Sequence, residues 1–158
     1  MTRLRLRVAT PPLDDVAVAG EAAQLLAMVA ALGIWRPERP VPELTTAVVG
    51  EALQAVADVG VVEAAAARWP ARAAEEAVAV AHWLASVLQE IVATPAPAAE
   101  LPKLAALFGP AGLAELLGVA PRALDRYLGG AQAVPDDVAH GAHLIAQIAG
   151  ALAGSYND

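Results

Sequence analysis

The 158-residue sequence contains no cysteine, and aromatic residues make up only 4% of it. The absence of cysteine excludes disulfides, thiolate nucleophiles and cysteine-ligated zinc. The two serines, Ser86 and Ser155, lie outside any nucleophile-elbow motif, and no glycine-rich loop carries the lysine that binds phosphate. The sequence therefore predicts a protein that is not an enzyme and that uses no cofactor.

Long apolar runs and a secretory signal are also missing. The amino terminus alternates arginine with leucine, and the uncharged helical runs fall short of the about 20 residues that span a bilayer. We therefore expect a soluble, cytoplasmic protein that does not contact a membrane. Hydrophobic residues, many of them alanine, nevertheless reach 58%, and the mean hydropathy is +0.51. This composition favours closely packed helices and a buried oligomer interface.

Basic residues are scarce in this chain of net charge −7. Residues 1–12 carry three arginines and no acid, residues 13–100 carry twelve acids against four arginines, and residues 101–158 carry three bases against five acids. Affinity for duplex DNA depends largely on cations that neutralise phosphates. A DNA-binding role would therefore require a homodimer that pools two sets of arginines, or would give weak binding.

Residues 1–12 are predicted to form a basic N-terminal arm or a short strand. Arg3, Arg5 and Arg7 alternate with apolar residues, which places three cations on one face of an extended segment. Such an arm can lie on DNA phosphates or in a minor groove. The alternative is an edge strand or a frayed terminus without a binding role.

Residues 13–93 show helical periodicity and are predicted to form an N-terminal helical bundle or dimerisation region. The most regular pattern is in 71–93, where Val80, Leu84 and Ile91 recur on one face. Small apolar residues on more than one side of these helices favour a homodimer core, with a self-contained bundle as the alternative.

The remainder of the chain is predicted to form a separate helical domain, so that the fold class is all-α. Residues 94–101 are rich in proline and alanine and are predicted to be a linker. Residues 102–158 then form the C-terminal domain.

Residues 108–135 have the spacing of a helix-turn-helix. Gly118 can take the left-handed conformation that ends a first helix, and Pro121 suits the first turn of a second helix. The small side chain of Ala114 allows the two helices to cross closely. The predicted core contacts are Leu113, Ala114, Leu117, Val119, Leu124, Tyr127 and Leu128.

The segment LAELLGVAPRALDRYLGG, followed by VPDDVA, resembles the Xre-type (Cro/C1-like) helix-turn-helix over roughly the last third of the chain. The resemblance implies that the helix beginning near Pro121 is a DNA recognition helix. Together with HGAHLIAQIAGALAGSYND, the segment also looks, more loosely, like the start of the Xre/MbcA/ParS-like antitoxins. That resemblance implies a transcriptional regulator that represses its own promoter and has a toxin as its partner.

Arg122 and Arg126 are the candidate DNA-reading residues, with Asp125 between them and Pro121 at the start of the same helix. Arginine donates two hydrogen bonds to guanine O6 and N7, and Asp125 can orient a guanidinium or accept from cytosine N4. The alternative is a solvent-exposed set of ion pairs on a helix that only packs. The protein would then be a non-enzymatic interaction module whose acidic helices bind a protein partner.

Asp136, Asp137, His140 and His143 are the one cluster with residue types that bind metals. Zinc needs at least three protein ligands. Besides the two histidines, the cluster offers only the carboxylates of Asp136 and Asp137, which lie at a helix start. We therefore expect no metal site, a helix over 136–154 opened by the carboxylates, and both histidines on its surface. The predicted inward residues of this helix are Val138, Ile145, Ile148 and Leu152.

Overall fold

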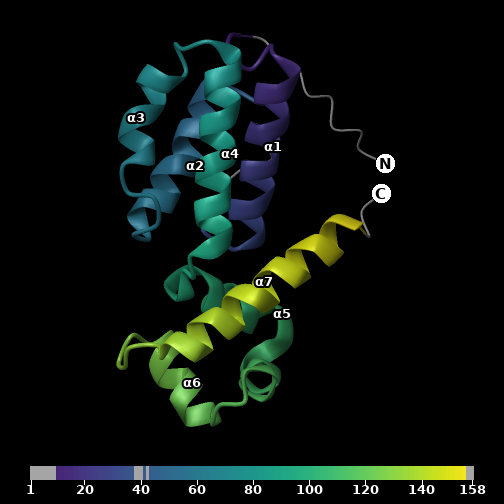
Figure 1. The fold of residues 1–158 in the computed structure, drawn as a ribbon. Helices are drawn as coiled ribbons and strands as arrows, with labels where there is room; N and C mark the ends of the chain where they lie inside the picture. The colour runs from purple at the N-terminus through teal and green to yellow at the C-terminus, as the bar shows by residue number, and fades with distance from the viewer. Residues whose placement is uncertain (1–9, 38–40, 42, 156–158) are drawn as a thin grey trace. The chain divides into compact units, whose positions relative to one another are not determined.

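The computed structural model describes residues 10–37, 41 and 43–155, and all regular secondary structure within these ranges is α-helical (Figure 1). The all-α prediction is confirmed. Of the predicted basic arm, residues 1–12, the structure describes only residues 10–12. Arg3, Arg5 and Arg7 lie outside the described residues. The described chain divides into two compact units: the residues up to Ala30 together with Trp35–Thr94, and Ala31–Ile34 together with the residues from Pro95 onward.

The first unit contains four helices: α1 (Val16–Ala31, whose last residue belongs to the second unit), α2 (Thr46–Asp58), α3 (Ala65–Arg72) and α4 (Ala77–Ala93). Short polar side chains start two of them. Asp15 Oδ1 accepts hydrogen bonds from the backbone N–H groups of Ala17 and Val18, at 2.9 and 3.2 Å, and Thr45 Oγ1 accepts one from Val48. These bonds satisfy amides that have no partner within the helix.

The core of the first unit is aliphatic, with two tryptophans at one side. Val80, Leu84 and Ile91 of α4 are fully buried, as the periodicity predicts. Trp69 of α3 stacks on Trp83 of α4 with ring centroids 6.0 Å apart. The indole N–H of Trp69 donates to the backbone oxygen of Thr46 at 2.8 Å, so the one polar atom of this buried ring is satisfied.

The second unit contains α5 (Pro97–Leu117), α6 (Pro121–Leu128) and α7 (Asp136–Ser155), and α5 packs against both other helices. α5 bends at Gly109, whose φ of 74° and ψ of 155° are non-helical. Pro110 follows directly and restarts the helix, because a proline at a first helical position lacks only an N–H that would be unpaired anyway.

The structure differs from the predicted linker 94–101 over most of its length. The boundary between the units falls at Thr94 and Pro95, but α5 begins at Pro97 and buries Glu100 and Leu101 to 0% and 1% exposure. The prolines that indicated a linker instead occupy the beginning of a helix, where proline is well tolerated.

Residues Ala31–Ile34 belong to the second unit because they pack on α5. Lys103 Nζ donates to the backbone oxygen of Ala31 at 2.5 Å. Gly33 has a φ of +75°, and a Cβ there would lie 2.8 Å from Lys103 Cδ. Glycine is therefore required at this position both by the backbone conformation and by the close approach of the lysine.

The turn at Gly118 provides a test of this local geometry. Gly118 has a φ of 65° and open space around its missing Cβ, so Gly118→Ala should cost only the backbone strain, about 1–2 kcal/mol of unfolding free energy. Gly112 lies within helical α5 with ordinary room for a Cβ, so Gly112→Ala should instead stabilise by about 0.5–1 kcal/mol. Urea unfolding followed by far-ultraviolet circular dichroism measures both; equal effects of the two substitutions would contradict the turn.

Candidate nucleic-acid interface

The turn before α6 is built from residues 118–120. Gly118 ends α5 in the left-handed conformation, and its N–H donates to the carbonyl oxygens of Ala114 and Glu115. The N–H of Val119 then donates to the oxygen of Ala114 at 3.0 Å. Pro121 is the first residue of α6. These two features place the end of α5 and the start of α6 where the glycine and proline spacing predicts them.

The inner face of α6 is held by one deeply buried side chain. Leu124 is 0% exposed, as is Leu113 of α5, and the neighbouring Ala114 is 2% exposed. Tyr127 and Leu128, predicted to face inward, are half-buried. Because Leu124 lies in the middle of an eight-residue helix, its burial determines which side of α6 faces solvent.

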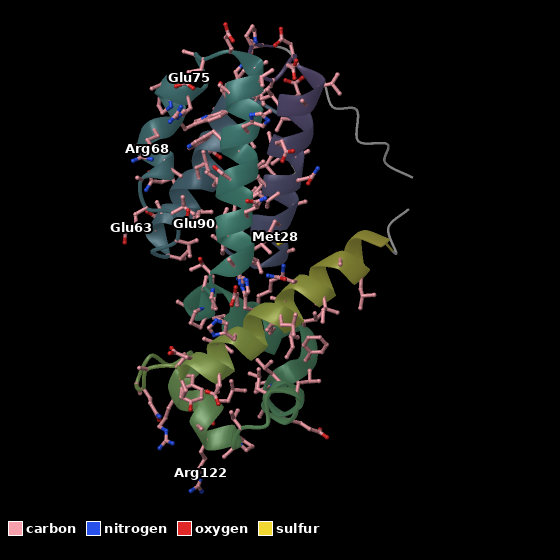
Figure 2. All side chains as sticks on the ribbon, in the orientation of Figure 1. Met28, Glu63, Arg68, Glu75, Glu90 and Arg122 are labelled. Atoms are coloured by element: carbon pink, nitrogen blue, oxygen red, sulfur yellow. The ribbon has the colours of Figure 1, made fainter. Side chains whose placement is uncertain are left out.

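The outer face of α6 carries the predicted DNA-reading residues. Pro121, Arg122, Asp125 and Arg126 are all exposed, and Figure 2 shows Arg122 extending away from the helix into solvent. The ion pairs recorded among the described residues are Arg72–Glu75 and Glu100–His143. Among the described residues, neither arginine of α6 forms an ion pair with a carboxylate.

Acidic residues lie in the same unit. Asp136 and Asp137 open α7 and are exposed, and Asp137 Oδ1 accepts from the N–H of Val138 at 2.9 Å. They satisfy and stabilise the positive end of the helix, as predicted. Their negative charge opposes the approach of a phosphate backbone.

A buried polar cluster joins α5 to α7, and the sequence interpretation missed it. His143 Nδ1 lies 2.5 Å from Glu100 Oε1, and Gln147 Nε2 lies 2.7 Å from His143 Nε2. Glu100 is 0% exposed and His143 is 6% exposed. The prediction of a surface histidine is therefore wrong for His143. It holds for His140, whose Nδ1 lies 2.7 Å from the backbone oxygen of Asp136 at an exposed position.

The inward residues predicted for α7 also need correction. Ile148 and Leu152 are 52% and 53% exposed. The buried residues are Val138, Ala139, Ala142, His143 and Ala146. The alanine spacing 139, 142 and 146 was the available signal, because small residues at helical spacing allow close approach of a second helix. His143 lies within that spacing.

Burial raises the pKa of the Glu100 carboxyl above its usual value of 4.5, and the hydrogen bond and charge of His143 oppose the increase. Glu100 Oε2 is buried without a hydrogen-bond partner. The pair is too deeply buried to meet a substrate, so its role is structural: it joins α5 to α7.

The described residues also include a pocket in the first unit. This pocket, of about 510 Å³, is lined by Pro11, Thr46, Ala47, Gly50, Trp69, Pro70, Ala73 and Ala74, none of which titrates. Within the described ranges, no group of three or more histidine, aspartate or glutamate residues is arranged to hold a metal ion. No single helix among the described residues is long and apolar enough to cross a membrane. The two consecutive helices α4 and α5, which are separated by a short break, reach that length and composition when taken together.

Comparison of the chain with known protein families, with curated protein sequences and with solved structures gives no match.

The Glu100 carboxyl predicts a pH dependence of stability. The pKa of this carboxyl lies above 4.5 in the folded chain. Between pH 4.5 and the folded-state pKa, the folded chain therefore binds a proton at Glu100 that the unfolded chain has released. Its contribution to stability is present below 4.5 and is lost as the pH rises through the folded-state pKa. Glu100→Gln cannot titrate, so wild type should lose stability relative to this variant as the pH rises from 4.5 through the folded-state pKa of Glu100.

Urea unfolding at stepped pH values measures this difference, with exposed Glu90→Gln as the matched control (Figure 2). The tryptophans Trp35, Trp69 and Trp83 all lie in the first unit, so circular dichroism, and not tryptophan fluorescence, should report the change. A difference between wild type and Glu100→Gln that stays constant or reverses with pH would contradict the burial of an ionisable Glu100.

Proposed function

We propose that the protein is a DNA-binding transcriptional regulator in which α5, the turn at 118–120 and α6 act as a helix-turn-helix. The observation that supports this most directly is the outer face of α6, which presents two exposed guanidinium groups that pair with no carboxylate of the described chain. Unpaired arginines on a short helix anchored by one buried leucine are suited to entering a major groove.

The two arginines are one helical turn apart, so their side chains project from nearly the same side of α6. Each can donate two hydrogen bonds to the major-groove edge of a guanine, and each such contact discriminates against a wrong base by about 1–3 kcal/mol. Asp125, on the adjoining side, can accept from cytosine N4. Ala120 and Ala123, which flank Pro121 and Arg122, offer no further hydrogen bonds, so α6 would read a short sequence.

The acidic composition sets the expected strength of binding. Duplex DNA attracts a protein mainly through phosphate contacts, and a chain of net charge −7 provides few of them. The proposal therefore predicts modest affinity that falls steeply as salt is added. A homodimer, which brings two copies of α6 to one operator, would raise it.

The resemblance to Xre-type domains and to Xre/MbcA/ParS-like antitoxins refines the proposal. On this basis the operator is the protein's own promoter, the site of action is the cytoplasm, and a toxin is its protein partner. Arg3, Arg5 and Arg7 would add phosphate or minor-groove contacts from the N-terminal arm.

A second candidate function is a protein-interaction module that does not read DNA. The observation that favours it is the number of large apolar side chains exposed on the second unit, which are Leu107, Phe108, Leu116, Leu144, Ile148 and Leu152. Exposed apolar groups of this kind are typical of protein-binding surfaces.

DNA binding can be tested by fluorescence anisotropy with a labelled mixed-sequence duplex at low and moderate salt. We expect binding at low salt, and we expect Arg122→Ala and Arg126→Ala each to weaken it. At a selected operator, each substitution should weaken binding by about 5- to 150-fold, which corresponds to the loss of one guanine contact.

Arg68→Ala is the matched control, because Arg68 is an exposed arginine of the first unit and its loss changes the net charge equally (Figure 2). Absence of binding at low salt, or equal effects of all three substitutions, would contradict the proposed interface and favour the interaction module.

A further inference from the structure

The helix α7 is apolar on two sides. One side is buried within the second unit through Val138, Ala142 and Ala146. The other side carries Leu144, Ile148 and Leu152, which are 58%, 52% and 53% exposed. These three residues, four positions apart, line up on one face; they are called the outer face of α7 below. No charged residue occurs between His143 and Asp158.

An apolar side of a helix is normally covered by another element or by a partner. On the described part of the first unit, the exposed large apolar residues are valines, which are Val16, Val78 and Val92. The outer face of α7 is instead a regular stripe of three large side chains. Such a stripe marks an interaction surface.

The spacing of the stripe makes it complementary to itself. A two-fold axis through Ile148 sets two copies of α7 antiparallel, brings the two Ile148 side chains together and places each Leu144 against Leu152 of the other copy. Such an isologous contact uses the same patch on both subunits. We propose that the outer face of α7 is a homodimer interface in which two copies pair antiparallel about Ile148.

Charge favours this occupant and this direction. An uncharged stripe cannot form ion pairs with a charged partner. Two copies of the stripe can pack together without repulsion between like charges. Asp136 lies twelve residues before Ile148, so antiparallel pairing keeps the acidic starts of the two helices about 36 Å apart along the axis. It also sets the helix dipoles in opposition, while parallel pairing would bring four carboxylates together.

The area of the stripe sets the expected affinity. The three side chains offer roughly 300 Å² of apolar surface per copy, against the about 800 Å² that each partner buries in a standard interface. A contact of this size is below that of a stable dimer, so the proposed dimer should be weak and transient. The proposed contact lies on α7, whereas residues 13–93 are the dimerisation region that the sequence predicts.

Antiparallel pairing also has a consequence that rests on the proposed function. The starts of α7, and with them the junctions to α6, would lie about 36 Å apart. Dimeric helix-turn-helix proteins bind half-sites about 34–36 Å apart, one turn of DNA. The operator would then be a palindrome with one-turn spacing between its half-sites.

The absence of native cysteine allows a direct cross-linking test of the register on the full-length chain. Ile148→Cys should form a disulfide-linked dimer on mild oxidation. Leu144→Cys and Leu152→Cys should each cross-link poorly alone and efficiently when mixed. Val78→Cys, at an exposed valine of α4, is the control and should stay monomeric. Cross-linking no greater for Ile148→Cys than for this control would overturn the proposal, as would Leu144→Cys pairing best with itself.

Sedimentation without DNA tests the interface independently of the proposed function. Wild type should show a monomer–dimer equilibrium as its concentration is raised, Ile148→Glu should weaken it at least tenfold, and Val78→Glu should leave it unchanged. Circular dichroism confirms that each variant is folded, and Ile148→Ala provides a milder substitution with a smaller loss. A wild type that is monomeric at all concentrations, or a dimer unaffected by Ile148 substitutions, would overturn the interface whether or not the protein binds DNA.

Discussion

The contact between Glu100 of α5 and His143 of α7 is the interaction on which the second unit depends. It joins the two long helices of the unit through a 2.5 Å hydrogen bond in a fully buried position. Removing His143 leaves the buried Glu100 carboxyl without its side-chain hydrogen-bond partner, which costs about 1–3 kcal/mol. α6 packs on α5 and leads into α7, so the orientation of its arginines depends on this contact.

The features that could be predicted from the sequence are local ones. Gly118 and Pro121 specify a turn through their own backbone preferences, and no distant residue is needed to interpret them. Leu124 is the apolar residue near the middle of a short, polar helix, so its burial and the exposure of Arg122 and Arg126 follow from the helical period.

The features that could not be predicted depend on residues far apart in the chain. Glu100 lies in a proline-rich stretch typical of a linker, and only the packing of α7 makes it a core residue. On α7, alanines mark one face and larger aliphatic residues another, so hydrophobicity alone favours the larger ones. Close helix packing instead selects the small residues, which leaves Ile148 outside.

The most direct test of the central claim, that the outer face of α6 contacts DNA, is an amide NMR titration of the nitrogen-15-labelled chain with a short mixed-sequence duplex at low salt. The account predicts that the amide shifts change first and most at 118–128, and that the first unit changes little. No change at any position, or changes concentrated in α1 to α4, would contradict it.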